Sequence, residues 1–303
     1  MQRQPGSVLR AGPAAEGGRS ATADARAAAQ SRIRWELFAN LVRKDLKVKY
    51  KGSSLGFIWS LANPVLYLAV FTLVFQVILP SRVPYFGVYF MAGLLAWNFF
   101  NTATLSATGS VVGAANLVKK VPFPRLVLPF ATVGFVGVQT LLQFGVFIAF
   151  LLAFYRDFLG PQLILALPAI FVAVLLTSAV SVLVSSLNVR WRDVQHLWEM
   201  VMIAGFWLTP IVYPLTLVRD KLGGAFRLYM LNPMVPVIAA LQRAIYVHPN
   251  PVDASGTPRE VLADGGYAFY LKWLGVAGLI GAVLLALGLW IFRRLDGTFA
   301  EEL

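Results

Sequence analysis

Apolar residues gather into long runs along the chain, and short polar segments separate these runs. The six runs lie at residues 57–79, 86–110, 126–154, 163–187, 197–213 and 268–292. Most of them reach the ~20 residues that an α-helix needs to cross ~30 Å of hydrocarbon. We therefore expect an all-α integral membrane protein with six transmembrane helices. The fifth run is short and ends at Pro210 and Pro214, so we expect its outer end to be bent or broken.

A further apolar segment, at 226–247, does not fit that count. Asn232, Pro233 and Pro236 would break a helix near its start, and a seventh span would carry the C-terminal arginines to the other side. We expect instead a pair of short re-entrant helices between spans five and six, dipping into the outer leaflet. Such backbone breaks are tolerated where protein or a water-filled cavity surrounds them.

The pattern before the first run is different. Over residues 32–52, apolar side chains recur at helical spacing, at Trp35, Phe38, Leu41, Val42 and Leu46. Basic residues crowd the remaining surface, at Arg43, Lys44, Lys47, Lys49 and Lys51. This pattern predicts an amphipathic helix in the membrane–water interface, and the alternative is a solvated helix packed on a partner. Residues 1–31 have no apolar period and are expected to form a disordered cytoplasmic tail.

Composition and charge agree with a membrane domain over 53–292, followed by a short cytoplasmic tail at 293–303. Hydrophobic residues make up 58% of the 303 and charged residues 13%, whereas a soluble chain carries about 25% charged residues. Eighteen of the 26 Lys and Arg residues fall before the first run, in the loops 111–125 and 188–196, and at the C-terminus. The positive-inside rule therefore places both termini in the cytoplasm. The chain has no cysteine and two histidines, so we expect no metal site.

Motifs for chemistry are scarce. A P-loop needs Lys followed by Ser or Thr, and none of the lysines has that neighbour, so a second polypeptide would have to hydrolyse any ATP. The spans hold almost no carboxylates, which disfavours proton or sodium coupling. The segment 188–196, NVRWRDVQH, could be an acid–base cluster of a membrane enzyme. We favour the simpler interpretation that Arg192 and Asp193 form an ion pair in an inner loop.

Polar and aromatic side chains within the spans are candidates for a transport path. Amides are costly in lipid, so we expect Asn98, Asn101, Gln139 and Gln143 to face a cavity. Rings follow the first two spans, among them Trp59, Tyr67, Phe71, Tyr89 and Trp97. Interfacial belts account for many such rings, and stacking on sugars is the alternative.

The loop at 116–129, NLVKKVPFPRLVLP, is stiffened by Pro122 and Pro124 and carries three cations, Lys119, Lys120 and Arg125. The residues alone leave two interpretations open. One is a turn at the membrane boundary, and the other is a rigid knob that docks into a cytoplasmic ATPase.

Five segments occur in an order that resembles a known family. They are LFANLVRKDLKVKYKGSSLGFIWSLANPVLYL (37–68), KKVPFPRLVLP (119–129), NVRWRDVQHLWEM (188–200), LTPIVYP (208–214) and LNPMVPVIAALQRAIY (231–246). Together they resemble permeases of type-two ABC exporters for O-antigen, capsule, teichoic acid and galactan. The resemblance covers about 36–292, and the combination of segments is more specific than any one of them.

The resemblance implies a homodimeric permease in a bacterial inner membrane, paired with two separate ATP-binding subunits that hold ATP and Mg. The substrate would be a polyprenyl-diphosphate-linked glycan, the other partner would be membrane lipid, and no nucleic acid is expected. The chain itself would need no cofactor and would not be an enzyme.

The resemblance implies the role of the coupling residues, and the contacts to the lipid diphosphate and the channel lining are hypotheses drawn from charge and residue type. The residues for coupling to the ATPase are Lys119, Lys120, Pro122, Phe123, Pro124 and Arg125. The residues for contact with the lipid diphosphate are Arg43, Lys44, Lys47, Lys49 and Lys51. The candidates for lining the channel are Trp59, Tyr67, Phe71, Tyr89, Trp97, Asn98, Asn101, Gln139 and Gln143. The rival hypotheses are an exporter of a small hydrophobic compound or lipid, a membrane glycosyltransferase, and a non-catalytic scaffold.

Overall fold

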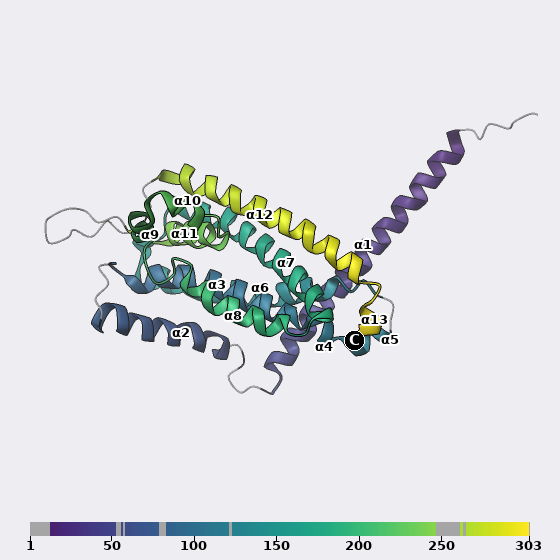
Figure 1. The fold of residues 1–303 in the computed structure, drawn as a ribbon, viewed down its shortest axis with the longest axis horizontal. Coiled ribbons are helices and arrows are strands. Elements are labelled where there is room, and N and C mark those ends of the chain that lie inside the picture. Colours follow the sequence, from purple (N-terminus) through teal and green to yellow (C-terminus); the bar gives the residue numbers. More distant parts are fainter. Residues whose placement is uncertain are drawn as a thin grey trace, which may run out of the picture.

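The computed structural model describes residues 13–52, 56, 58–78, 83–120, 123–246, 261–262 and 265–302. All regular structure in these residues is helical (Figure 1). The longer helices are α1 (Pro13–Tyr50), α2 (Ile58–Thr72), α3 (Phe86–Thr108), α6 (Val127–Phe154), α7 (Ala166–Arg190), α8 (Val194–Trp207), α11 (Met234–Ile245) and α12 (Gly266–Leu295). The shorter elements are η1 (Leu73–Ile78), α4 (Ser110–Gly113), α5 (Ala115–Lys120), η2 (Arg156–Phe158), η3 (Pro161–Leu165), α9 (Leu215–Leu222), η4 (Gly223–Ala225), α10 (Phe226–Tyr229) and α13 (Phe299–Glu302).

Three helical stretches in the described part are long and apolar enough to cross a membrane: Val127–Phe154, Pro161–Arg190 and Gly266–Leu295. The chain is therefore an all-helical protein with several helices of membrane length. The expected count of six spans also needs α2, α3 and α8, which are shorter or less apolar, and it stays a prediction.

Helix α3 forms the centre of the bundle. Phe86, Tyr89 and Phe90 at its start are fully buried, and α6, α7, α8 and α11 pack around it. Helix α12 runs along α7, as Figure 1 shows. Gly288 allows that approach, because a Cβ there would lie 3.2 Å from the backbone oxygen of Ala179. Small residues at such a contact bring two backbones close together, which is how apolar helices gain packing energy within a membrane.

The break predicted near Pro210, at the C-terminal end of the fifth run, is confirmed. Helix α8 ends at Trp207, and the chain then turns through Pro210 towards α9. Carbonyls freed by that turn are satisfied from within the protein. The Tyr89 hydroxyl donates to the carbonyl oxygens of Pro210 (3.3 Å) and Tyr213 (3.0 Å), and the Gln242 amide donates to that of Pro210 (2.8 Å). These bonds tie α3, the turn and α11 together.

The segment 226–247 contains two short helices, α10 and α11, separated by a turn at Asn232 and Pro233. The Asn232 side-chain oxygen accepts a hydrogen bond from the backbone N–H of Met234 (3.2 Å) at the predicted break, just before α11. Pro236, which was also predicted to break the helix, lies in the first turn of α11, where a proline is tolerated. Helix α11 is buried against α3, α7 and α12. Helices α9 to α11 gather at one end of the bundle, and α5 and α13 lie at the other end (Figure 1).

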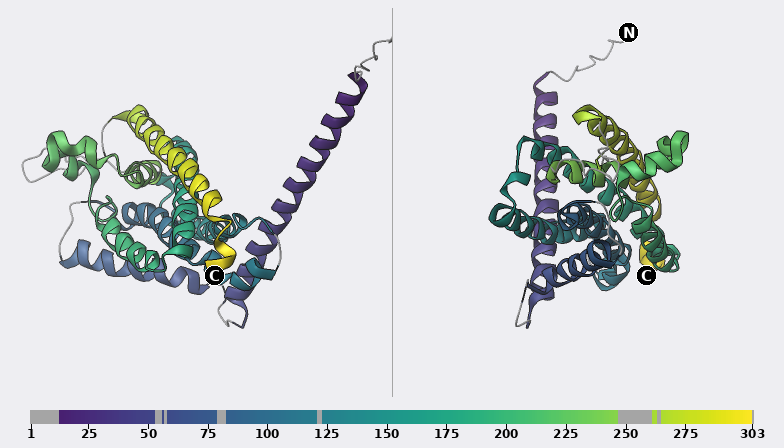
Figure 2. Two further views of the ribbon diagram at one scale, coloured as in Figure 1. Left: turned by 45° about the vertical axis from the view of Figure 1, so that its right-hand side comes forward. Right: turned by 90° about the vertical axis from the view of Figure 1, so that its left-hand side faces the viewer.

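Helix α1 is longer than predicted, because it begins at Pro13 within the segment expected to be disordered. Alanine and arginine are frequent from residue 21 onward, and both favour helix even where an apolar stripe is absent. The N-terminal part of α1 projects away from the bundle, and its C-terminal part packs against α6 (Figure 2). The apolar face of the predicted amphipathic helix therefore rests in part on the protein itself.

Candidate functional site

A polar cavity of about 450 Å³ lies where the end of α1 meets α2, α3 and α6. Its walls bring together six predicted channel residues: Trp59, Tyr67, Asn98, Asn101, Gln139 and Gln143. Lys49, Tyr50, Gly56, Pro64, Thr102, Val136 and Thr140 complete the lining. A cavity surrounded by amides, hydroxyls, rings and one cation is chemically suited to a hydroxylated ligand that also carries negative charge.

Lys49 is the cation of this cavity. Its ammonium donates a hydrogen bond of 2.6 Å to Oε1 of Gln139 and lies 5.7 Å from the centre of the Phe135 ring. Partial burial lowers the pKa of the Lys49 ammonium, because desolvation disfavours the charged form. An anion that entered the cavity would offset this desolvation cost, so the position favours binding of negative charge.

Two amide atoms in the cavity wall are buried and have no hydrogen-bond partner among the described residues. They are Oδ1 of Asn101 and Nε2 of Gln139. The ammonium of Lys49 can only donate, so Gln139 presents its oxygen to Lys49 and its NH₂ group remains available. One acceptor and one donor are thus left unpaired on two residues that line the same cavity, although buried amides are almost always paired.

Three predicted channel residues, Phe71, Tyr89 and Trp97, lie outside this cavity. Tyr89 is fully buried and holds the turn after α8, and Trp97 is 4% exposed and packs between Phe100 and Phe206. Phe71 stacks on Phe90 with ring centres 4.7 Å apart. Ring type alone does not separate core from lining, because apolar burial favours both positions.

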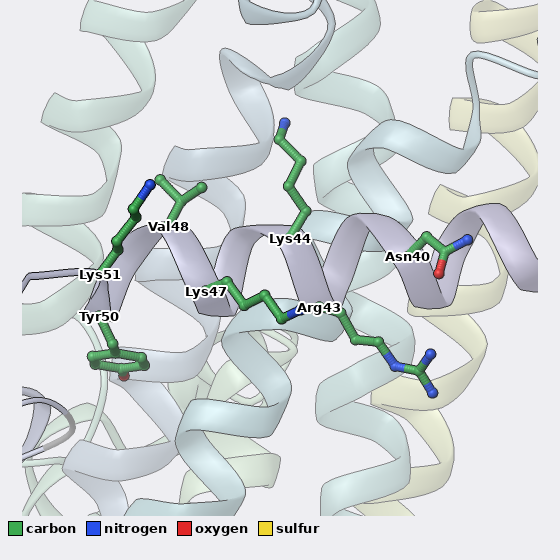
Figure 3. A pocket seen from close by; sticks show the side chains of 7 residues that line it. All are labelled: Asn40, Arg43, Lys44, Lys47, Val48, Tyr50 and Lys51. Carbon is green, nitrogen blue, oxygen red and sulfur yellow. The ribbon is translucent and has the colours of Figure 1, made fainter.

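The five predicted diphosphate contacts divide between two faces of α1. Arg43, Lys44, Lys47 and Lys51 line an exposed hollow of about 840 Å³ together with Asn40, Val48 and Tyr50 (Figure 3). We call this surface the basic hollow. In Figure 3, Lys44 points to one side of the helix and Arg43 to the other, so the cations spread around the solvent face.

Lys49, the fifth predicted diphosphate contact, lies on a different face of α1 from the other four. Phe38, Val42 and Lys49 follow one another at intervals of about one and two turns, so they share one face. That face packs on α6, where the Phe38 ring contacts Gly134 and the Lys49 ammonium donates a hydrogen bond to Gln139. The same spacing could have separated Lys49 from the other four cations in the sequence.

An apolar groove of about 660 Å³ adjoins the polar cavity and shares Pro64 and Gln143 with it. Helices α2, α3 and α6 form its walls. Its apolar lining includes Val65, Leu68, Val88, Met91, Leu95, Val146, Phe147 and Phe150. The two hollows together form an amphipathic surface, polar beside Lys49 and apolar towards the start of α3.

The loop expected to couple to an ATPase lies beside the C-terminus. Pro122 lies outside the described residues, and of Lys120 only the helical backbone is described. Lys119 is exposed at the end of α5. Phe123, Pro124 and Arg125 line a hollow of about 500 Å³ with Asp296 and Gly297.

The contact with Asp296 was not predicted. Arg125 donates hydrogen bonds to the backbone oxygen of Asp296 and to its carboxylate (3.2 Å), forming an ion pair. Phe299 is 1% exposed and packs with Phe292. The segment 293–303, predicted to be a short cytoplasmic tail, is thus partly folded onto the loop, and the aromatic Phe299 after a turn was its signal in the sequence.

The segment 188–196 does not carry the expected ion pair. Arg192 and Asp193 are both exposed, and Nδ1 of His196 lies 3.6 Å from Oε2 of Glu199 one turn further along α8. Asp193 precedes α8, so its backbone caps a helix start. No group of three or more His, Asp or Glu side chains that could hold a metal occurs in the described part of the chain.

Comparison with known proteins gives the class of this chain. Residues 36–246 match the ABC-2 type transporter family, and the chain belongs to that family as a multi-pass membrane permease, a transport component. It is similar to the O-antigen export system permease protein RfbA of Klebsiella pneumoniae, with 27% identity over 89% of this chain and 95% of the relative. It is also similar to the RfbA permease of Myxococcus xanthus, with 31% identity over 70% of this chain and 81% of the relative.

Proposed function

We propose that this chain is the permease subunit of an ATP-driven exporter of polysaccharide carried on a polyprenyl diphosphate. Two relatives named for O-antigen export support the substrate class. The observation that carries the proposal is the polar cavity, where Lys49 stands beside amides and the exposed rings of Trp59 and Tyr67. Amides bind hydroxyl groups, rings can stack on sugar faces, and a cation offsets phosphate charge.

In the proposed arrangement, α2 with η1, α3, α6, α7, α8 and α12 are the six spans, with both termini in the cytoplasm of a bacterial inner membrane. Helix α11 and its neighbours form the outer re-entrant segment, and the C-terminal part of α1 lies at the inner interface. The permease works as a homodimer with two ATP-binding subunits, which supply ATP and Mg. The basic hollow attracts the lipid diphosphate at the inner surface.

The hollow between the loop at 123–125 and Gly297 supports a role in coupling. A rigid knob beside the membrane surface is what an ATPase needs in order to push on a transmembrane bundle. Because Arg125 is bonded to Asp296 next to α12, a push on the loop reaches the end of that helix. We propose that Phe123, Pro124 and Arg125 contact the ATP-binding subunit.

Reconstitution tests the function. The chain and its ATP-binding subunit are placed in liposomes with a fluorescent polyprenyl-diphosphate glycan, and entry of the glycan is measured by protection from periodate. Protection that requires ATP is expected. Charge reversal of Lys47 and Lys51 should abolish it, whereas unchanged export would refute the diphosphate contact.

The apolar groove supports a second candidate, export of a small hydrophobic compound or lipid. In the same liposomes, ATP-dependent movement of a sugar-free lipid with none of the glycan would favour this candidate. Activity without any ATPase that is lost in Arg192→Ala would indicate a glycosyltransferase. Absence of all flux would indicate a scaffold.

A further inference from the structure

We propose that Lys49, Gln139 and Asn101 form a subsite for the glycosyl diphosphate end of the lipid carrier, with Lys49 on phosphate and the two amides on the first sugar. This inference rests on the proposed function and sharpens it. It assigns recognition of the first sugar to the permease itself, at the junction of α1, α3 and α6. The basic hollow then provides attraction without recognition of a sugar.

The unpaired amide atoms carry the argument for a sugar. Oδ1 of Asn101 and Nε2 of Gln139 are buried and lack partners among the described residues. Leaving such groups unpaired costs free energy, and a ligand that pairs with them removes this cost. A sugar hydroxyl can both donate and accept, and an acetamido group offers one atom of each kind, so sugar chemistry matches this pair of atoms.

Lys49 carries the argument for the phosphate. An ammonium has three donors, and Gln139 uses one of them, so two remain for phosphate oxygens. Partial burial lowers the pKa of Lys49, and the described lining of the cavity holds no carboxylate that would compensate its charge. On the adjoining turns of α1, Asp45 pairs with Lys44 (3.9 Å), and Arg43, Lys47 and Lys51 leave a net positive charge, so the local field also favours an anion.

The neighbouring groove explains how the carrier is oriented. The apolar groove begins at Pro64 and Gln143, which also line the polar cavity. A molecule with a polar head and a long hydrocarbon tail can therefore place the head beside Lys49 and the tail along the groove. A free sugar or a free diphosphate would fill only the polar part.

The test compares two lipids on one complex. The permease with its ATP-binding subunit is titrated in nanodiscs with a polyprenyl diphosphate that bears one N-acetylhexosamine, and with the sugar-free polyprenyl diphosphate. Bound lipid is counted by native mass spectrometry. Asn101→Leu should weaken binding of the sugar-bearing lipid roughly ten-fold and change binding of the sugar-free lipid by less than roughly two-fold. Lys49→Gln should weaken both lipids by similar factors.

A matched control uses another buried glutamine. Gln162 in η3 donates a hydrogen bond to the carbonyl of Phe158 in η2 and does not line the cavity, so Gln162→Met should leave the binding of both lipids unchanged. The inference is wrong if Asn101→Leu weakens the binding of both lipids equally or weakens the binding of neither. If the wild-type complex exports glycan while Asn101→Leu binds both lipids normally, the inference alone fails. If the wild-type complex binds neither lipid, the proposed function fails with it.

Discussion

The docking of α1 on α6 is open to a sharp test at Gly134. A Cβ added there would lie 2.6 Å from Cζ and 3.0 Å from Cε2 of Phe38, and 3.3 Å from a methyl group of Val42. Ordinary van der Waals contact begins near 3.4 Å, so Gly134→Ala forces the ring to move by most of an ångström. Trp35 stacks on the Phe38 ring, with the ring centroids 5.3 Å apart, and restricts that movement. We expect the substitution to weaken the contact between α1 and α6.

Overpacking of this size costs about 1–3 kcal/mol, which shifts the balance between docked and undocked α1 by roughly five-fold to over a hundred-fold. The chain has no cysteine, so a thiol introduced by Val42→Cys is unique. Val42 is 8% exposed, and a water-soluble maleimide reaches it only when α1 lifts from α6. The labelling rate then follows the undocked population, and Gly134→Ala should raise it by the same factor.

Two further variants make the result specific. Gly137→Ala on the same helix is the matched control, because its nearest neighbour would be Phe99 at 3.7 Å, and it should leave labelling unchanged. Phe38→Leu combined with Gly134→Ala should restore protection, since a shorter side chain relieves the overlap. Equal labelling rates in Gly134→Ala and Gly137→Ala would refute the docking geometry.

Three other substitutions probe separate contacts. Gly288→Ala should lower the stability by about 1–3 kcal/mol, because the added methyl group meets a backbone oxygen of α7. Gly275→Ala is the control, because open space surrounds that position and its stability should not change. The midpoint of thermal aggregation measures both variants. Arg125→Gln removes the bonds to Asp296, so glycan moved per ATP hydrolysed should fall while the complex still assembles in size-exclusion chromatography. Because the pKa of Lys49 is lowered, the wild-type protein should lose this cation and release lipid as the pH rises. An arginine stays charged at alkaline pH, so Lys49→Arg should keep its lipid bound there. Native mass spectrometry across pH 7–10 compares the two proteins.

Much of the fold could be predicted because solvent imposes it. Backbone groups in hydrocarbon must pair within their own segment, so long apolar runs become helices and their lengths follow from the sequence. Pro210 and Pro233 have no backbone N–H for a bond inside a helix, and the chain turns at Pro210 and at Asn232–Pro233. The length of α1 was not predictable from an apolar stripe, because its N-terminal half has none and relies on helix propensity.

The candidate site was predictable by residue type and less so by position. Amides in the apolar runs indicated a cavity, and four of them line one. Rings gave no such indication, since Tyr89 and Trp97 satisfy burial within the core as well as they would satisfy a lining. The bond from Arg125 to Asp296 joins residues 171 positions apart, and no local pattern encodes such a pairing.

Lys49 shows how one helix can serve two environments. The four cations of the basic hollow face solvent, where salt screens their attraction within about 10 Å, so they attract anions without holding one in a fixed place. Lys49 lies on the opposite face, in contact with Gln139, and its attraction is less screened because it is partly desolvated. An anion that arrives at the hollow therefore gains by moving around the end of α1 into the cavity. The register of α1 on α6, set where Phe38 meets Gly134, places the ammonium of this exposed side chain against Gln139, at the edge of the cavity.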